Sequence, residues 1–276
     1  MTLTEVRQLI AAIDLRPSKA LGQNFLVDNN ILQIILREAH VRADETVIEI
    51  GPGLGCLTEE LMIRAKRVIA IEKDPRLCAY LRDRFPNLEL IAGDAVKILG
   101  SQFAIPSART KVVSNLPYSI SSPILECFVE GDPKPGVMVV TLQREVAQRL
   151  GATPGHKEYG ALTLFTQLYY HVTIAHIISP SCFYPAPQVE SAVVVLERRD
   201  PRVKLEDPKL FHDLVRHGFN QRRKMLRKLL AEFGTTEAAY HAAGVEPTAR
   251  AEELSLDQWI TLTNAIPRRA DGDQLR

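Results

Sequence analysis

The chain has 276 residues, of which 46% are hydrophobic and 24% charged, and its formal net charge at pH 7 is +1. These values are ordinary for a globular protein and suffice for one large domain and one small domain. The small net charge excludes a protein whose whole surface attracts nucleic acid. No apolar run is long enough to cross a bilayer, so we expect no membrane association.

The N-terminus lacks the pattern of a signal peptide, and the four cysteines are scattered without a C-x-x-C pair. Such cysteines are typical of reduced thiols in a cytoplasmic protein. No histidine-rich or comparable cluster indicates a metal site, so the expectation is a cytoplasmic protein without a metal.

The first 28 residues are expected to form an arm. Residues 2 to 13 have a helical pattern, in which Thr2 and Glu5 are spaced as a capping box. The irregular segment that follows is basic and polar but contains Phe25 and Leu26, which fits either a segment docked onto the protein or a free surface arm. A second helix is expected at residues 29 to 39, after the capping residue Asp28.

Residues 46 to 61 combine a short apolar run, three glycines at alternate positions from Gly51, and a helical pattern. A buried strand, a glycine turn and a helix start predict a ligand-binding crevice at the end of a parallel strand. The glycine spacing is not that of dinucleotide-binding folds. Glu49, just before the glycines, would repel a pyrophosphate but would suit a ligand with an ammonium or sulfonium group. The alternative is a glycine-rich turn without a ligand.

Acidic residues follow the next two predicted strands. Residues 67 to 71 end at Glu72, whose carboxylate is placed to accept both hydroxyls of a ribose. Residues 88 to 91 precede Asp94, which could accept from an adenine amino group. For both acids the alternative is a structural role, as a helix cap or a surface acid.

A fourth strand, residues 111 to 114, runs into the tetrapeptide Asn115-Leu116-Pro117-Tyr118. The carbonyls of Asn115 and Leu116 could accept the two hydrogens of an exocyclic amine, and Tyr118 could stack on a flipped base. The alternative for this tetrapeptide in isolation is an Asx turn with a core tyrosine.

The order of these strand ends resembles the class I S-adenosylmethionine methyltransferases. The match is closer to the KsgA-type small-subunit rRNA adenine dimethyltransferases, and it covers residues 18 to 262. The motifs that carry the resemblance are residues 23–26, 49–53, 115–118, 184–193 and 219–224.

Further along, a strand is expected at residues 137 to 142, with a helix opening at residues 143 to 145 and another at residues 161 to 170. Two more strands are expected at residues 171 to 178 and 190 to 197.

The proline-rich run between these last two strands holds Phe183 and Tyr184, either of which could cover the far face of a target base. The resemblance favours Phe183, for which core packing is the alternative. Tyr184 and Ala186 depart from the family pattern, where threonine and proline are usual, so the shape of that wall differs.

After a linker near residues 198 to 206 the chain is expected to be helical, at residues 208–218, 221–233, 236–243 and 256–265. We therefore predict a main domain over residues 1–200, including the arm, and a helical domain over residues 206–276. Basic residues without any acid fill the segment from 216 to 228, which suits RNA phosphates, although a solvated helix face is the usual reading of such a run. The candidates for RNA binding are Arg222, Arg223, Lys224 and Arg227.

The resemblance implies an α/β protein with a Rossmann-like, seven-stranded mixed sheet whose last strand is antiparallel, followed by the helical domain. It implies methyl transfer from S-adenosylmethionine to the N6 amines of two adjacent adenosines, twice each, in the 3′-terminal hairpin of small-subunit rRNA during subunit biogenesis. The partner would be that rRNA or an immature small ribosomal subunit, and we expect a monomer. Carried over residue by residue, the catalytic group is Asn115, Leu116, Tyr118 and Phe183, and the cofactor-binding group is Asn24, Leu26, Gly51, Glu72, Asp94 and Asn115.

Two alternatives stay open. An Erm-type enzyme would methylate a large-subunit adenosine, although the helical tail domain and the basic run after Phe219 argue against it. An RNA-binding assembly factor whose methylation is incidental belongs to a different class of function. An NAD-dependent oxidoreductase is disfavoured by the glycine spacing.

Overall fold

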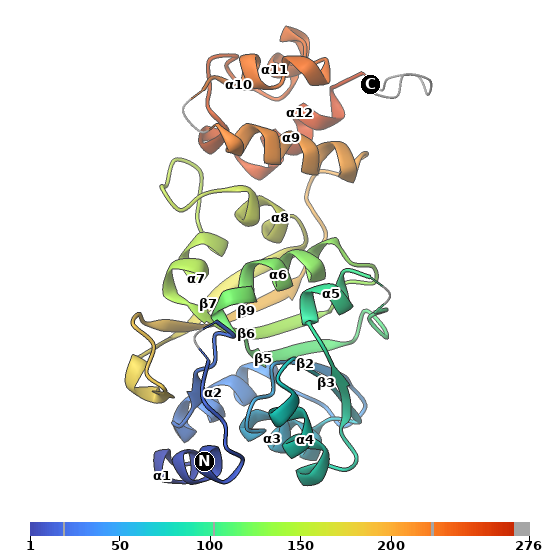
Figure 1. The fold of residues 1–276 in the computed structure, drawn as a ribbon. Coiled ribbons are helices and arrows are strands. Elements are labelled where there is room, and N and C mark those ends of the chain that lie inside the picture. Colours follow the sequence, from blue (N-terminus) through green and yellow to red (C-terminus); the bar gives the residue numbers. More distant parts are fainter. Residues whose placement is uncertain (19, 102, 222–223, 268–276) are drawn as a thin grey trace. The chain divides into compact units, whose positions relative to one another are not determined.

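The computed structural model of this chain describes residues 1–18, 20–101, 103–221 and 224–267 (Figure 1). The chain forms two compact units. The first contains residues 1–148 and 170–198, and the second contains residues 149–169 together with the chain from residue 199 onward. The passage between the units after Arg198 lies in the expected linker, whereas residues 149–169, which we expected in the main domain, belong to the helical unit. The boundaries at 200 and 206 stay a prediction about independently folding domains.

A seven-stranded mixed sheet forms the centre of the first unit, with the strand order β4-β3-β2-β5-β6-β9-β7. The neighbours from β4 to β6 are parallel, and β9 is antiparallel to both of its neighbours. The predicted sheet with an antiparallel last strand is therefore confirmed. The strands are β2 (Thr46–Ile50), β3 (Arg67–Glu72), β4 (Glu89–Ala92), β5 (Lys111–Asn115), β6 (Val137–Gln143), β7 (Tyr170–Ile178) and β9 (Ser191–Arg198).

Helices cover both faces of this sheet, with α2, α3 and α4 on one face and α5, α6 and α7 on the other (Figure 1). Such covering explains why the parallel strands are almost wholly apolar. The helices are α2 (Asn29–Ala39), α3 (Cys56–Arg64), α4 (Pro75–Arg84), α5 (Ala95–Leu99), α6 (Ser121–Glu130) and α7 (Arg144–Leu150).

Side-chain caps start α2 and α4, and the cap of α2 is the one that the sequence predicted. Asp28 accepts from the backbone N–H groups of Asn30 and Ile31 at the start of α2. Asp74 accepts from Arg76 at the start of α4, where a proline occupies the first turn. These bonds satisfy N–H groups that have no partner within the helix.

The N-terminal arm docks onto the first unit. Helix α1 (Leu3–Ala12) starts with the predicted capping box and packs Val6 and Ile10 into a hydrophobic cluster with residues of the arm and the sheet unit. The short strand β1 (Phe25–Leu26) pairs antiparallel with β8 (Phe183–Tyr184) in a separate two-stranded sheet. This pairing, between segments far apart in the chain, was not predicted.

The second unit is helical in its described residues. The predicted continuous helix at residues 221–233 is wrong, because Met225 is extended and a short helix, α10 (Leu226–Leu229), is followed by a 3-10 turn at Ala231–Phe233. The N–H of Leu226 donates to the carbonyl of Ala249, so a tertiary hydrogen bond replaces a helical one there. The other helices are α8 (Ala161–Tyr169), α9 (Pro208–Asn220), α11 (Glu237–Ala242) and α12 (Leu256–Asn264).

A buried lysine joins three segments of the first unit. The ammonium of Lys111, at the start of β5, donates to the carbonyls of Ala39 and His40 at 2.9 and 2.7 Å and pairs with Glu45 at 2.9 Å. It thereby caps the C-terminus of α2, where His40 adopts a left-handed conformation. The three partners account for all three donors of the ammonium group.

We expect Lys111→Met to lower the free energy of unfolding by roughly 3 kcal/mol, because the change leaves a nearly buried carboxylate and two helix-end carbonyls without their donor. Denaturant titration would measure the loss. The control is Lys209→Met, since the Lys209 side chain is 88% exposed and pairs with Asp213 on the same helix. Equal stability of the two variants would contradict this role for Lys111.

Candidate active site

A large cleft lies at the carboxyl ends of β2, β3, β4 and β5, with about 1130 Å³ of empty space when its open side is included. Parallel strands that end at one edge of a sheet create such a crevice. The predicted site residues that line this cleft are Asn24, Leu26, Gly51, Glu72, Asp94, Asn115, Leu116 and Tyr118. Residues spread over nearly 100 positions of sequence are thus brought together.

The glycine turn forms the floor of this cleft and needs its glycines. Gly51 and Gly53 have φ of +65° and +58°, a region that other residues rarely adopt. A Cβ added at Gly51 would lie 2.9 Å from the Pro117 ring, and one at Gly53 would lie 3.1 Å from the Phe25 ring. The bare backbone therefore leaves room between the arm and the end of β5.

Glu49 lies beneath the glycine turn with only 2% of its surface exposed. The hydroxyl of Thr58 donates to its Oε2 at 2.7 Å. Burial raises the pKa of Glu49 to about 8, against the Thr58 hydrogen bond, and the nearby charge of Glu72 adds to the rise. Burial therefore favours the protonated form of this carboxyl at neutral pH.

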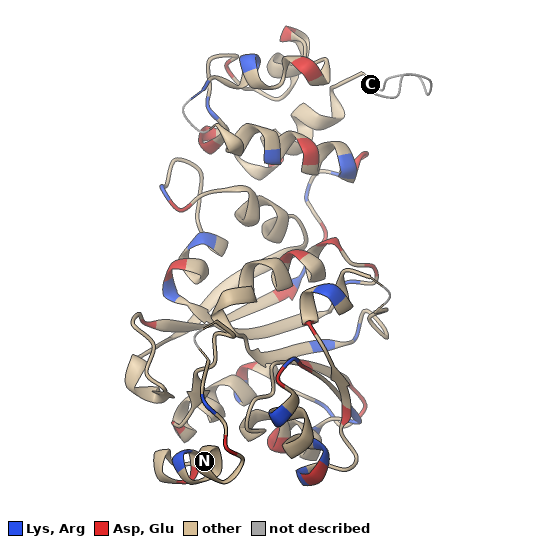
Figure 2. Cartoon of the chain, viewed as in Figure 1, with Lys and Arg blue, Asp and Glu red and all other residues tan. Residues whose placement is uncertain are grey.

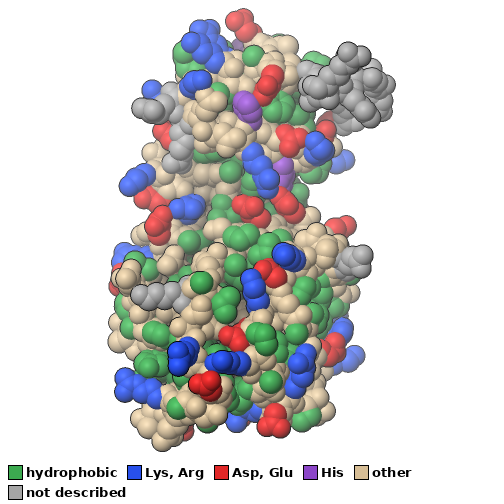
Figure 3. All heavy atoms as spheres, in the orientation of Figure 1, with side chains coloured by type: hydrophobic (Ala, Val, Ile, Leu, Met, Phe, Trp, Pro, Cys, Tyr) green, Lys and Arg blue, Asp and Glu red, His purple; other side chains and the backbone are tan. Residues whose placement is uncertain are grey.

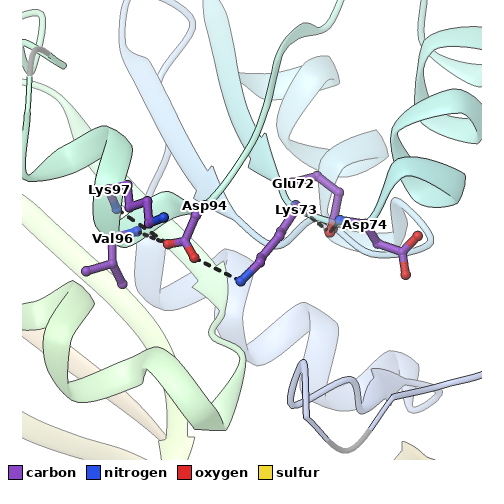
Figure 4. Close-up of polar contacts among 6 residues, drawn as sticks. All are labelled: Glu72, Lys73, Asp74, Asp94, Val96 and Lys97. Carbon is purple, nitrogen blue, oxygen red and sulfur yellow. Dashed lines mark hydrogen bonds and ion pairs between the residues drawn. The ribbon is translucent and has the colours of Figure 1, made fainter.

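Glu72, the last residue of β3, is held by backbone donors (Figure 4). Its Oε1 accepts from the N–H groups of Lys73 and Asp74, both at 2.8 Å, and its Oε2 accepts from Gly53 at 3.3 Å. Burial raises the pKa of Glu72, and these donors offset part of the rise. The free acceptor capacity of the carboxylate is on Oε2.

Asp94 has the structural role that the sequence offered as the alternative, and its role towards an adenine stays a prediction. Its Oδ1 caps α5 by accepting from Val96 and Lys97, while it also lines the cleft. Its Oδ2 pairs with the ammonium of Lys73 at 2.9 Å, as Figure 4 shows, and this hydrogen bond is the main reason why the pKa of Asp94 is lowered. A ligand amine that donates to Oδ2 would have to share it with Lys73.

Asn115 ends β5 with its carboxamide held from two sides. Its Nδ2 donates to the carbonyl of Asn24 in the arm at 3.0 Å, and its Oδ1 accepts from the hydroxyl of Thr141 in β6. Three residues later, the Tyr118 hydroxyl shares a hydrogen bond with the Ser191 hydroxyl of β9. The strands behind the tetrapeptide therefore hold both its amide and its ring.

Phe183 is the one predicted catalytic residue that does not line the cleft. It is 3% exposed and packs in the hydrophobic core among Leu26, Ile178 and Val193. The neighbouring Tyr184 packs with the cluster of α1, where the Arg7 guanidinium lies 5.2 Å from the centre of its ring. Because Phe183 packs in the core and does not line the cleft, its base-covering role stays a prediction.

The candidates for RNA binding lie in the second unit. Arg222 and Arg223 fall outside the described residues, whereas Lys224 and Arg227 are described and exposed, as is Lys228. Figure 2 shows basic and acidic residues interspersed along the elements of both units. Among the described residues, none of the helices is long and apolar enough to span a membrane. The same part of the chain has no group of three or more His, Cys, Asp or Glu side chains that could hold a metal ion.

The residues of the cleft fit S-adenosylmethionine. A buried carboxylate with a free acceptor position suits a ribose, a buried carboxyl under the turn suits a cation, and the glycines leave the space that a ligand needs.

Comparison with known proteins gives the family. Residues 15–267 match the family model described as ribosomal RNA adenine dimethylase. The chain is 41% identical over 273 residues to the ribosomal RNA small subunit methyltransferase A of Clostridium perfringens, covering 96% of this chain and 95% of that protein. It is 38% identical over 270 residues to the protein of the same name from Clostridium acetobutylicum, covering 95% and 98%.

Two solved structures are also similar. One is a dimethyladenosine transferase from Plasmodium falciparum, with a TM-score of 0.70 and 26% identity, covering 86% of this chain and 95% of that one. The other is the 23S rRNA methyltransferase ErmE, with a TM-score of 0.68 and 28% identity, covering 88% and 99%. The chain belongs to the ribosomal RNA adenine dimethylase family, and it is an rRNA adenine methyltransferase that uses S-adenosylmethionine.

Proposed function

We propose that the protein dimethylates the N6 amines of two adjacent adenosines in the 3′-terminal hairpin of small-subunit rRNA. The relatives that are 38–41% identical over almost the whole chain are named for the small subunit, which supports this choice of substrate. The observation that supports the chemistry most directly is the convergence of Glu72, Asp94 and Asn115 on one cleft. These residues supply acceptors for a ribose, an adenine and an exocyclic amine.

The strand order supports a direction for the cofactor. Because β4, β3, β2 and β5 are neighbours in that order, Asp94, Glu72, the glycine turn and Asn115 follow one another along the sheet edge. The adenine, the ribose and the charged methionine end of the cofactor are linked in the same order. We assign the adenine to Asp94, the ribose to Glu72, and the charged end to the region of Gly51, Glu49 and Asn115.

When bound, S-adenosylmethionine supplies a methyl group activated by a positively charged sulfur. The arm residues Asn24 and Leu26 close the cleft over this ligand, since both line it and β1 is held by its pairing with β8. Leu26 is buried and offers an apolar wall, whereas the carbonyl of Asn24 is already engaged by Asn115.

The target amine is a poor nucleophile because its lone pair is delocalised into the adenine ring. The Asn115 Oδ1 and the Leu116 carbonyl accept its hydrogens, which orients the nitrogen and draws it towards a tetrahedral geometry in line with the methyl group. The same acceptors stabilise the positive charge that develops on nitrogen. Tyr118 stacks on the base, and the proton leaves to water after transfer.

Phe183 can cover the base only if its ring leaves the core in which it packs. We therefore assign the stacking on the base mainly to Tyr118. Phe183 would contribute only if β8 rearranges when RNA binds.

The exposed basic residues Lys224, Arg227 and Lys228 suit contacts with RNA phosphates. The net charge is only +1, and charges of both signs are mixed with apolar side chains on the face drawn in Figure 3, so attraction to RNA must be local. We propose an immature small ribosomal subunit as the partner, a monomer as the active form, and the cytoplasm as the location, because that is where such a substrate is met.

The similarity to ErmE favours a second candidate, methylation of a large-subunit adenosine. An additional role in subunit assembly is compatible with either reaction, since a protein that binds an immature subunit also blocks it. Ribosome profiles of cells carrying Asn115→Ala would separate the assembly role from methylation.

The reaction is tested by incubating the protein with unmodified small subunits, or with large subunits, and methyl-labelled S-adenosylmethionine, followed by digestion to nucleosides. We expect label in N6,N6-dimethyladenosine from small subunits alone. Asn115→Ala should lower turnover by about 100-fold, because it removes an acceptor made for the transition state. Label from large subunits only would replace the proposal by the Erm-type reaction, and normal turnover of Asn115→Ala would refute the amine-orienting role.

Glu72→Gln should weaken S-adenosylmethionine binding by roughly 1–3 kcal/mol, because glutamine replaces one of the two acceptor oxygens by an NH2 group, which must then face either the backbone donors or the ribose hydroxyls. Isothermal titration calorimetry would measure the dissociation constant. The control is Glu89→Gln, since Glu89 starts β4 at the far end of the strands and pairs with Arg67 on the surface. The assignment fails if Glu72→Gln binds as tightly as this control.

Cofactor affinity should depend on pH through Glu49. Below a pKa of about 8 this carboxyl carries a proton that a cation must displace, so the affinity should rise between pH 6 and 7.5, by up to about tenfold per unit. In Glu49→Gln this pH dependence should be lost, because the amide does not titrate. If the cofactor affinity of the wild type and that of Glu49→Gln change with pH in the same way, the positively charged end of the cofactor does not bind beside Glu49.

A further inference from the structure

We propose that Thr141 is a positioning residue for methyl transfer, whose hydroxyl fixes the Asn115 carboxamide with its carbonyl oxygen towards the target amine. The inference deepens the proposed function and rests on it. Thr141 does not line the cleft, and none of the sequence motifs that carry the family resemblance includes it.

The sheet places Thr141 directly beside Asn115. The two residues are register partners in the parallel pair of β5 and β6, and the Thr141 hydroxyl donates to the Asn115 Oδ1. Thr141 is fully buried in a strand whose buried residues are otherwise apolar, Val137–Gln143. A buried hydroxyl is unfavourable unless it is hydrogen-bonded. The hydrogen bond to Asn115 therefore explains why a hydroxyl is tolerated at position 141.

The orientation of the amide follows from its second partner. The Asn115 Nδ2 donates to the carbonyl of Asn24 at 3.0 Å. A flipped amide would place Oδ1 against that carbonyl oxygen, so that two acceptors would face each other. A donor from β6 and an acceptor from the arm together hold the group in one rotamer. The Oδ1 keeps one lone pair for a hydrogen of the substrate.

The second methyl transfer should depend on this arrangement more than the first. An unmodified adenine amine offers two hydrogens to the two acceptors, Asn115 Oδ1 and the Leu116 carbonyl. After one methyl is added, the nitrogen has a single hydrogen left, so fewer hydrogen bonds orient it. An Asn115 amide that is held only by the Asn24 carbonyl will therefore misplace the monomethylated amine more often than the unmodified one.

The experiment compares steady-state methylation of unmodified small subunits by the wild type, Thr141→Val and Thr141→Ser. In Thr141→Val we expect kcat to fall about tenfold while the KM for the subunit is unchanged, since the variant loses orientation but no contact with RNA. The fraction of N6-monomethyladenosine in the product should rise several-fold. Thr141→Ser keeps the hydroxyl and should stay within about threefold of the wild type in both measurements.

The matched control is Thr166→Val. Thr166 is also fully buried, but among the described residues its hydroxyl has no hydrogen-bond partner, so the same replacement there should leave kcat and the product ratio unchanged. If Thr141→Val lowers the folded fraction, Thr141→Ala removes the same hydroxyl without an added methyl group, and the product ratio of its folded fraction is measured instead.

Three results would overturn the proposal: a normal kcat in Thr141→Val, equal losses in the serine and valine variants, or a loss of rate with an unchanged ratio of mono- to dimethyladenosine. The last result would reveal a purely structural role, because fewer folded molecules slow both transfers alike. Failure of the proposed function would look different, since the wild type itself would then form no N6-methylated adenosine on small subunits.

Discussion

The parallel pairing of β4, β3, β2 and β5 is the constraint on which the rest of this structure depends. Ile50 lies opposite Ile71 and Glu72 lies opposite Ala92, so the strands end at nearly the same level. Each strand end then contributes one polar group or one turn to the same cleft. A shift of one residue in any register would turn these side chains towards the opposite face of the sheet.

The N-terminal arm contacts the ends of β3 and β5 and forms part of the cleft wall. Gly22 lies so close to the end of β5 that an added Cβ would be 2.9 Å from the backbone nitrogen of Tyr118, and the Asn24 carbonyl holds the Asn115 amide. Gln23 reaches Asp74 beyond the end of β3 at 3.1 Å. The arm therefore contacts the ends of both β3 and β5, so the proposed cofactor site and the proposed substrate site would share one cover.

The same first unit contains two kinds of buried ionisable side chain. Lys111 has three partners and stabilises the junction of α2, β2 and β5, whereas Glu49 has one hydroxyl partner and a raised pKa. An incompletely paired acid in a cleft is unfavourable for folding and favourable for binding a cation. A complete set of partners, as at Lys111, is typical of a residue that stabilises the fold. An incomplete set, as at Glu49, is typical of a residue in a binding site.

The sequence by itself predicted the caps of α1 and α2 and the strand ends at Gly51, Glu72, Asp94 and Asn115, because strand periodicity, glycine turns and capping residues act locally. The resemblance to known methyltransferases implied the class of the sheet. Only the tertiary structure decided that β1 pairs with β8, that Phe183 packs in the core, and that Thr141 holds Asn115. It also broke the helix expected at residues 221–233, where Leu226 bonds to Ala249. Each of these outcomes rests on a partner distant in sequence, which no local pattern can specify.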